Sequence, residues 1–364
     1  MRTKVKVQIQ NFRKRQIYCW ILVGNAILFI LLFVLQQFPS VVENFYSRGF
    51  YPYFSYLPKL LFSWLPFSMG DLFYGVIVGF LCYHFFMLLI SCFKKHWQKG
   101  LDKLLLILCI SASLYAYFYV SWGMNYYRHP LHQQMGLHIP EHIEEEDYLR
   151  VVDKYIQQAN HLRAQIVLED LNKEEAKEIL VNTMKTDSTF AGTLSKTQVK
   201  VKSPLSSELV SHFTVAGYFN PFTHDVQVNE KIYIASYPFT VVHELSHQMG
   251  IGFEDECNFI AFLKLKNHPN PWYAYSVSYE TLKYLLRAPY FRGKEKYQAY
   301  YGKLSDEVKA DYEAERALWL SYSGWINRVS DFFYSGYLKH NNQPEGMARY
   351  SMMSRLVVAW EMKP

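Results

Sequence analysis

In the second half of the chain stands Val241-Val242-His243-Glu244-Leu245-Ser246-His247-Gln248. Residues i and i+4 of an α-helix lie on one face, so a helix here places the two imidazoles one above the other. Imidazoles in that arrangement can hold one Zn²⁺ ion at about 2.0–2.1 Å each. Glu244 then lies beside the ion, where it can act as a general base on zinc-activated water. The motif therefore predicts a hydrolytic zinc site on a helix.

The flanking residues favour a buried helix over 238–249. Pro238 suits the first turn of a helix, because the N–H groups of that turn have no partner within the helix and proline lacks only this group. Apolar side chains at 241, 242 and 245 provide the packing surface that a buried helix needs. Gly250 and Gly252 follow the second histidine and end the helix soon after it.

A catalytic zinc site needs a third protein ligand. The next predicted helix, over 254–266, begins Glu254-Asp255-Glu256-Cys257-Asn258. Acidic residues in a first turn also interact favourably with the helix dipole, so their presence alone does not identify a ligand. Glu254 and Glu256 are the main candidates, with Asp255 the weaker third.

Two stretches of the sequence resemble motifs of known protein families. The HExxH motif resembles the zincin metallopeptidases, and Glu254-x-Glu256-Cys257-Asn258 is similar to the Glu-x-Glu-Ala-Asp/Asn helix of gluzincins. That resemblance implies that Glu254 is the third zinc ligand and that Asn258 supports a ligand from behind, with Glu256 as the alternative ligand. Segment 121–364 also resembles an uncharacterised bacterial family of integral membrane proteins that has this motif.

The spacing departs from the gluzincin pattern. Only six residues separate His247 from Glu254, whereas most gluzincins place many more between the second histidine and the glutamate. This spacing is closer to that of metzincins, whose HExxHxxGxxH pattern the chain follows as far as Gly250. Phe253 stands where that pattern has its third histidine, and a phenylalanine side chain cannot bind a metal.

The N-terminal third predicts a membrane anchor of three spans, over about 17–35, 72–93 and 104–122. None of these stretches contains a Lys, Arg, Asp or Glu, and each approaches or exceeds the ~20 residues that cross a bilayer. Segment 50–66 is apolar but short, and it contains three prolines. We interpret it as an interfacial or re-entrant segment.

The distribution of charge predicts the orientation. Basic residues crowd before the first span and between the second and third, which places those parts in the cytoplasm. Three spans then leave residues 123–364 on the extracytoplasmic side of a bacterial inner (cytoplasmic) membrane. The motif lies more than 100 residues beyond the last span, which argues against an intramembrane protease.

Residues 123–364 are predicted to form one α+β domain, mainly helical with a small mixed sheet. Helices are expected over about 144–163, 173–185, 276–287, 305–338 and 346–361, and strands over 212–218 and 225–228. This domain has 26 Lys plus Arg against 29 Asp plus Glu, so nucleic acid is an improbable partner.

The expected function is a membrane-anchored zinc peptidase that acts on peptides or proteins. A non-catalytic zinc-containing sensor or envelope assembly protein is the alternative, although such a protein has no need of a base at Glu244. Zincins commonly add a side chain that stabilises the oxyanion. The candidates for that role are Tyr218, His224, Tyr337, Arg349 and Tyr350.

Overall fold

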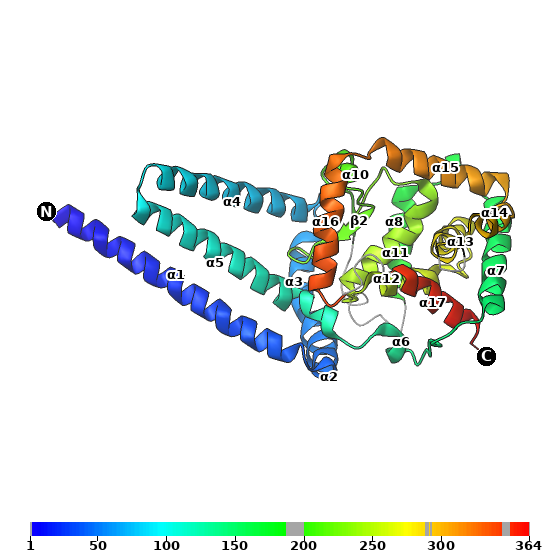
Figure 1. Cartoon of the computed structure of the whole chain (residues 1–364), viewed down its shortest axis with the longest axis horizontal. Coiled ribbons are helices and arrows are strands. Elements are labelled where there is room, and N and C mark those ends of the chain that lie inside the picture. The colour runs from blue at the N-terminus through cyan, green and yellow to red at the C-terminus, as the bar shows by residue number, and fades with distance from the viewer. Residues whose placement is uncertain (1, 187–199, 288–290, 292, 344–349, 364) are drawn as a thin grey trace.

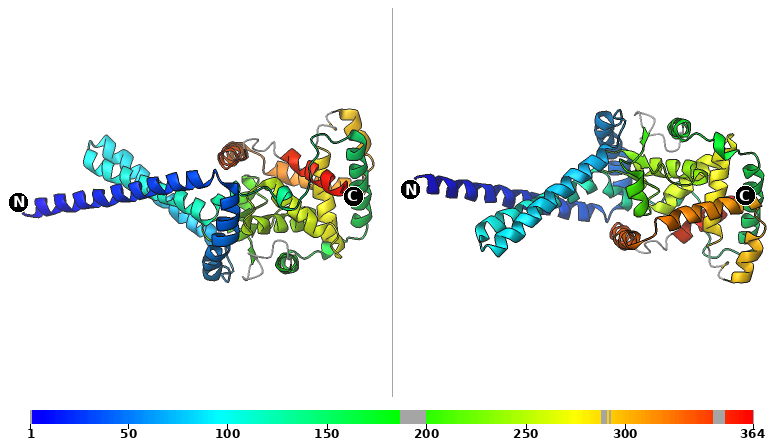
Figure 2. Two further views of the ribbon diagram at one scale, coloured as in Figure 1. Left: turned by 90° about the horizontal axis from the view of Figure 1, so that it is seen from below. Right: turned by 90° about the horizontal axis from the view of Figure 1, so that it is seen from above.

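The computed structural model describes residues 2–186, 200–287, 291, 293–343 and 350–363 (Figure 1). A long helical arm contains the described residues up to Trp122, and a helical body contains those from Gly123 onward (Figures 1 and 2). The mainly helical fold with a small sheet confirms the coarse prediction.

Three helices of the arm are long and apolar enough to cross a membrane. They are α1 (Arg2–Leu35), α4 (Met69–Phe93) and α5 (Trp97–Ser121). Each contains a candidate span of 25 residues, which exceeds the ~20 that cross a bilayer. These helices contain almost all of the three predicted spans and indicate membrane association.

The connection from α1 to α4 is itself helical. It comprises α2 (Pro39–Val41), the π-helical η1 (Val42–Phe50) and α3 (Tyr51–Phe62). With 12 residues, α3 is too short to cross a bilayer. This connection also contacts the body: the buried hydroxyl of Tyr51 donates a hydrogen bond to the carbonyl of Gln248 at 2.6 Å. The segment predicted as interfacial therefore supports the body as well.

Helices make up most of the body. In chain order they are η2 (Gly123–Tyr127), α6 (Leu131–Gln134), α7 (Glu145–Arg163), η3 (Leu168–Asp170), α8 (Lys173–Lys185), α10 (Ser207–His212), η4 (Ile234–Ser236), α11 (Tyr237–Gln248), α12 (Glu254–Leu265), α13 (Pro271–Leu285), α14 (Lys294–Tyr301), α15 (Asp306–Ser321), α16 (Trp325–His340) and α17 (Tyr350–Glu361). Helix α11 contains the motif, and its Val241, Val242 and Leu245 are fully buried in the main core.

The described residues contain one small mixed sheet. Its strands β1 (Val201–Lys202), β2 (Gly217–Phe219) and β3 (Val226–Val228) lie in the order β1-β3-β2. β3 pairs parallel with β1 and antiparallel with β2, with Tyr218 opposite Gln227. β2 is therefore an edge strand, and it lies against α11.

Two predicted elements are wrong in their extent. The strand predicted over 212–218 starts only at Gly217, because Ser206 caps a helix that continues to His212; its hydroxyl accepts from the N–H of Leu209 at 3.1 Å. The single helix predicted over 305–338 is two helices, α15 and α16. The chain is extended at Gly324, whose N–H donates to the side chain of Asn327 at 2.7 Å and starts the second helix.

Two other helices differ at their start. Asn270 caps α13, so this helix begins at Pro271, before the predicted residue 276. Residues 346–349 of the helix predicted over 346–361 lie outside the described residues, and α17 is described from Tyr350 onward.

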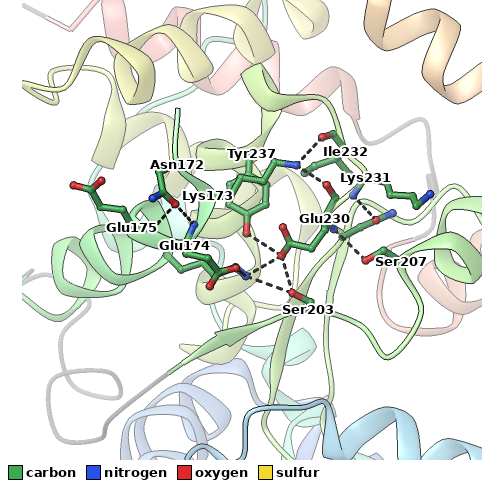
Figure 3. Close-up of polar contacts among 12 residues, drawn as sticks. Asn172, Lys173, Glu174, Glu175, Ser203, Ser207, Glu230, Lys231, Ile232 and Tyr237 are labelled. Atoms are coloured by element: carbon green, nitrogen blue, oxygen red, sulfur yellow. Dashed lines mark hydrogen bonds and ion pairs between the residues drawn. The ribbon is translucent and has the colours of Figure 1, made fainter. Parts of the chain in front are cut away.

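The start of the motif helix is held by a polar network around Glu230 (Figure 3). The carboxylate of Glu230 accepts from the hydroxyls of Ser203 at 2.7 Å and Tyr237 at 3.4 Å, and pairs with Lys177 at 2.8 Å. Lys173 donates to the Glu230 carbonyl at 2.5 Å. The network thereby joins α8 and the residue after β1 to the first residue of α11.

A buried ion pair joins the arm to the sheet. Asp225 and Lys202 are only 3% and 4% exposed, and their charged atoms lie 2.7 Å apart. Asp225 also accepts from the backbone N–H groups of Met69 and Gly70, in the first turn of α4. Lys202 donates to the carbonyl of Phe62 at 2.7 Å.

We predict that Asp225→Ala destabilises the protein by about 3–5 kcal/mol, because it leaves Lys202 buried without its counter-charge. The exposed residue Asp170 provides the matched control, and Asp170→Ala is expected to change stability by no more than about 0.5 kcal/mol. Thermal unfolding of the full chain in detergent measures both. Equal stabilities for the two variants would contradict the prediction.

Candidate metal site

Three predicted ligands converge in the structure. The Nε2 atom of His243 lies 3.2 Å from one carboxylate oxygen of Glu254, and that of His247 lies 3.5 Å from the other. Their ligand atoms all fall within 4.8 Å of one another, so the three side chains could hold a metal ion. Two imidazole nitrogens and a carboxylate are a donor set that divalent transition metals accept.

Both imidazoles are held by hydrogen bonds at their other nitrogen. Nδ1 of His243 lies 2.7 Å from the side-chain oxygen of Asn258, and Nδ1 of His247 lies 2.9 Å from the carbonyl of Ile251. A carbonyl oxygen only accepts, so each Nδ1 donates, and the Nε2 atoms are the ring nitrogens that face the shared site. Metal-binding histidines are commonly oriented in this way.

A tight turn brings Glu254 to the histidines. Gly250 has φ +90°, which an L side chain rarely adopts, and the N–H of Ile251 donates back to the carbonyl of Ser246 at 3.2 Å. A Cβ on Gly252 would lie 2.7 Å from the ring of Tyr126. The turn therefore needs glycine at both positions, and α12 can begin at Glu254.

Side chains from outside the motif cap the end of α11. The last carbonyls of a helix have no partner within it. Here the indole N–H of Trp122 donates to the carbonyl of His247 at 2.8 Å, and Tyr51 donates to that of Gln248. Arg128 donates to the carbonyl of Gly250 at 2.9 Å. Trp122 directly follows α5 and lies 125 residues before His247 in the sequence. The candidate site therefore lies against the end of an apolar helix that is distant from it in the chain.

Glu244 lies against the edge strand of the sheet. A Cβ on Gly217 would come within 2.7 Å of Cγ and 2.9 Å of an oxygen of the Glu244 side chain. Glycine in β2 therefore allows this carboxylate to sit between the strand and α11. Glu244 and Gly217 both line the same cavity as the three candidate ligands.

The alternative ligand Glu256 is placed elsewhere. It is 3% exposed, and its carboxylate accepts from the backbone N–H of Leu131 at 2.6 Å. Within the described residues, the group that could hold a metal contains Glu254 and not Glu256. The structure thus favours Glu254 over Glu256.

The five candidate oxyanion donors separate clearly. Tyr337 lines the cavity, and its hydroxyl lies 3.0 Å from that of Tyr126. Tyr218 also lines it, but its hydroxyl donates to Asp71 at 2.5 Å. His224 is buried against Tyr51 and does not line the cavity. Arg349 and the side chain of Tyr350 lie outside the described residues.

Burial and charge shift the pKa values of the site. Burial raises the pKa of Glu244 to about 6, against the opposing charges of His243 and His247. Burial also raises the pKa of the Cys257 thiol to about 12, so this neighbour of His247 is neutral. Burial lowers the pKa of His247, but its neighbours Cys257 and Glu254 outweigh burial and raise that pKa above its usual range.

The cavity has a volume of about 610 Å³ and extends well beyond the three ligands. One face of α11 lines it from Phe239 to His247, together with Ser236 just before this helix. The far wall holds a charged cluster in which Lys283 pairs with Glu280 at 2.7 Å and Glu315 at 2.5 Å. The sequence analysis missed this cluster, because its members come from α13 and α15 and match no motif.

We predict that Asn258→Ala lowers the affinity of the full chain for a divalent metal by about 10–100-fold, because it releases the ring of His243. Asn258→Asp is the matched control, since it keeps an oxygen acceptor for Nδ1 and is expected to retain most of the affinity. Competitive titration with a chromogenic chelator measures both. Affinity in Asn258→Ala equal to that of the wild type would show that this hydrogen bond does not support the site.

Comparison with known proteins gives a single family. No curated protein and no solved structure matches the chain. A family model described as a protein of unknown function (DUF3810) matches residues 46–358. The match includes α3, α4 and α5 as well as the candidate site, so it covers part of the arm together with the body. The chain therefore belongs to the DUF3810 family.

Proposed function

We propose that this protein is a membrane-anchored, zinc-dependent hydrolase of the peptidase type, with the fold of a zincin-like domain on a three-span anchor. The observation that carries the proposal is the placement of His243, His247 and Glu254 within 4.8 Å of one another, with Glu244 beside them in one cavity. A purely structural site has no need of an adjacent buried carboxylate.

The residues have distinct roles in this proposal. His243, His247 and Glu254 hold the ion, which when bound supplies a Lewis acid that polarises a carbonyl group and acidifies water. Glu244 accepts the proton of the attacking water and passes it to the leaving amine. Tyr337 is the described candidate for a donor to the developing oxyanion.

The edge strand provides a way to hold a peptide. β2 pairs with β3 on one side only, and its residues line the cavity beside Glu244. An extended peptide can add to such an edge through main-chain hydrogen bonds. The seven helical steps from Ser236, the N-cap of α11, to His243 span about 10 Å, which corresponds to about three residues of extended peptide. The cavity is therefore long enough for a peptide segment.

The charge of the cavity favours basic substrates. Its lining contains five carboxylates, from Glu244, Glu254, Glu280, Glu315 and Asp331. Besides the two histidines, Lys283 is its one basic residue among those described. When ionised, the five carboxylates have a total charge of −5, whereas Lys283 and a bound divalent cation together have +3. The lining would then have a net charge of −2. We infer a preference for peptides with Lys or Arg near the scissile bond.

The position of the site favours substrates close to a membrane. Trp122 joins the last turn of α11 to the end of α5. With α5 as a span, the metal ligands lie at the bilayer surface, on the extracytoplasmic side that the charge distribution predicts. Polypeptide segments that emerge from a bacterial cytoplasmic membrane, or are anchored to it, would then be within reach.

We predict that Glu254→Gln loses bound zinc whereas Glu256→Gln keeps it. The two positions share the first turn of α12, but only Glu254 faces the histidines, and Glu256→Gln retains an oxygen acceptor for Leu131. Elemental analysis of the purified full chain gives the zinc content of each variant. Zinc loss in Glu256→Gln alone would reverse the assignment.

We predict that Glu244→Gln keeps its zinc but lowers peptide hydrolysis by at least about 10²-fold, because a general base typically contributes about 10²–10⁴. The assay uses fluorescence-quenched peptide libraries with the full chain in vesicles, and half of the peptides bear an acyl chain that anchors them to the lipid. Glu313→Gln is the matched control and is expected to keep both zinc and hydrolysis, since Glu313 is exposed on α15 and does not line the cavity.

Hydrolysis that persists in Glu244→Gln would refute the role of this base. A wild-type protein that binds zinc and cleaves neither kind of peptide would favour the alternative function, a sensor or assembly protein that retains a metal site.

A further inference from the structure

Helix α16 has two faces of different character. Ser330, Asp331, Tyr334 and Tyr337 line the cavity. At 100° per residue, the opposite face presents Trp325, Val329, Phe332 and Phe333, which recur at i, i+4, i+7 and i+8. These four side chains, called here the outer face of α16, are 72%, 46%, 76% and 69% exposed, in that order.

So much exposed apolar surface on one helix indicates an interaction site. Three aromatic side chains that would each bury about 150–250 Å² leave most of their area in contact with solvent. Monomeric soluble proteins rarely expose contiguous apolar patches of more than about 300–600 Å², and such patches mark surfaces that meet a partner or a membrane.

The end of α16 is tied to the end of α5. The hydroxyl of Tyr115 lies 2.7 Å from Nε2 of His340, and Tyr119 donates to the side chain of Asn341 at 3.0 Å. Both tyrosines belong to the last two turns of α5. Figure 1 shows α16 running across the direction of the three apolar helices where these meet the body, and Figure 2 shows it nearly end-on at the same level.

This level corresponds to the surface of the bilayer that the three helices would cross. Helix α16 thus lies at the level where the three apolar helices meet the body (Figures 1 and 2), and its end is hydrogen-bonded to one of them. Arg328 and Lys339 are exposed and border the outer face along one edge. Basic residues beside Trp and Phe are typical of helices that lie in the interface, with cations at the phosphates and rings below them.

We propose that α16 is an interfacial membrane helix whose outer face inserts into the extracytoplasmic leaflet. Its other face forms the wall of the metal-site cavity that lies toward the lipid, so one helix separates the bilayer from the candidate site. The occupant is lipid, because α16 lies at the end of the spans, is tied to α5 and has exposed basic residues beside its apolar outer face. This inference rests on the membrane anchoring in the proposed function and not on catalysis.

Photo-crosslinking of the full chain in lipid vesicles tests this inference. Phe332 or Phe333 is replaced by the photoreactive residue benzoylphenylalanine, and the products are identified by mass spectrometry. Tyr297 on α14 is the matched control, because it is also an exposed aromatic residue but lies at the far end of the body (Figure 1). All three replacements exchange one aromatic ring for another at an exposed position, so the fold should be retained.

The expected result is a phospholipid adduct at 332 and 333, many times more abundant than at 297. An adduct with a second copy of the chain, or lipid adducts no more abundant than at 297, would overturn the inference. This readout needs no enzymatic activity, so it distinguishes a failure of the interfacial helix from a failure of the proposed hydrolase.

A second measurement tests the consequence for the cavity. The double substitution Phe332→Asp/Phe333→Asp is expected to lower hydrolysis of acyl-anchored peptides several-fold and to leave that of free peptides unchanged, because it lifts the cavity wall from the lipid. Equal losses for both kinds of peptide would show that α16 does not act through the membrane.

Discussion

The capping of helix α11 is the constraint on which the rest of the molecule depends. Its terminal carbonyls belong to the same turn as His247, and they cannot be left buried without donors. The donors are Trp122, Tyr51 and Arg128, which come from the end of α5, the α1–α4 connection and the segment after η2. The geometry of the candidate metal site and the packing of the arm are therefore coupled, since a shift of the arm would uncap the helix that presents the second histidine. The family match begins at residue 46 and so includes Tyr51.

The same coupling explains why the site lies where it does. Trp122 and Tyr126 belong to a small core with Tyr51 and Phe253, apart from the main core of the body. Phe253, which occupies the place of a third histidine in one related pattern, packs into this core and directs Glu254 toward the histidines. Across the cavity, α16 shares hydrogen bonds with Tyr115 and Tyr119. Elements of the arm thus support the cavity from two sides, so the cavity lies beside the ends of the apolar helices although the motif is distant from them in sequence.

Local patterns predicted a large part of this arrangement. The i, i+4 histidines, Pro238 and Gly250 were enough for the motif helix, and uncharged apolar length was enough for the three spans. Proximity in sequence and family resemblance together favoured Glu254 but left Glu256 open as the alternative. The capping residues could not be predicted, because they lie 122 to 197 residues from their carbonyls and the chain has 30 Tyr and 8 Trp from which to choose. The sequence did not predict the break at Gly324, because the apolar pattern continues across it. For the same reason it did not predict that α16 has two faces of different character.

The central claim is that His243, His247 and Glu254 hold a zinc ion that Glu244 puts to hydrolytic use. Its most direct test is the zinc content of the full-length protein, measured together with peptide cleavage in the wild type and Glu244→Gln. We expect one zinc ion per chain in both the wild type and Glu244→Gln, and peptide cleavage by the wild type alone. A wild-type protein without zinc, or equal cleavage by the two proteins, would contradict it.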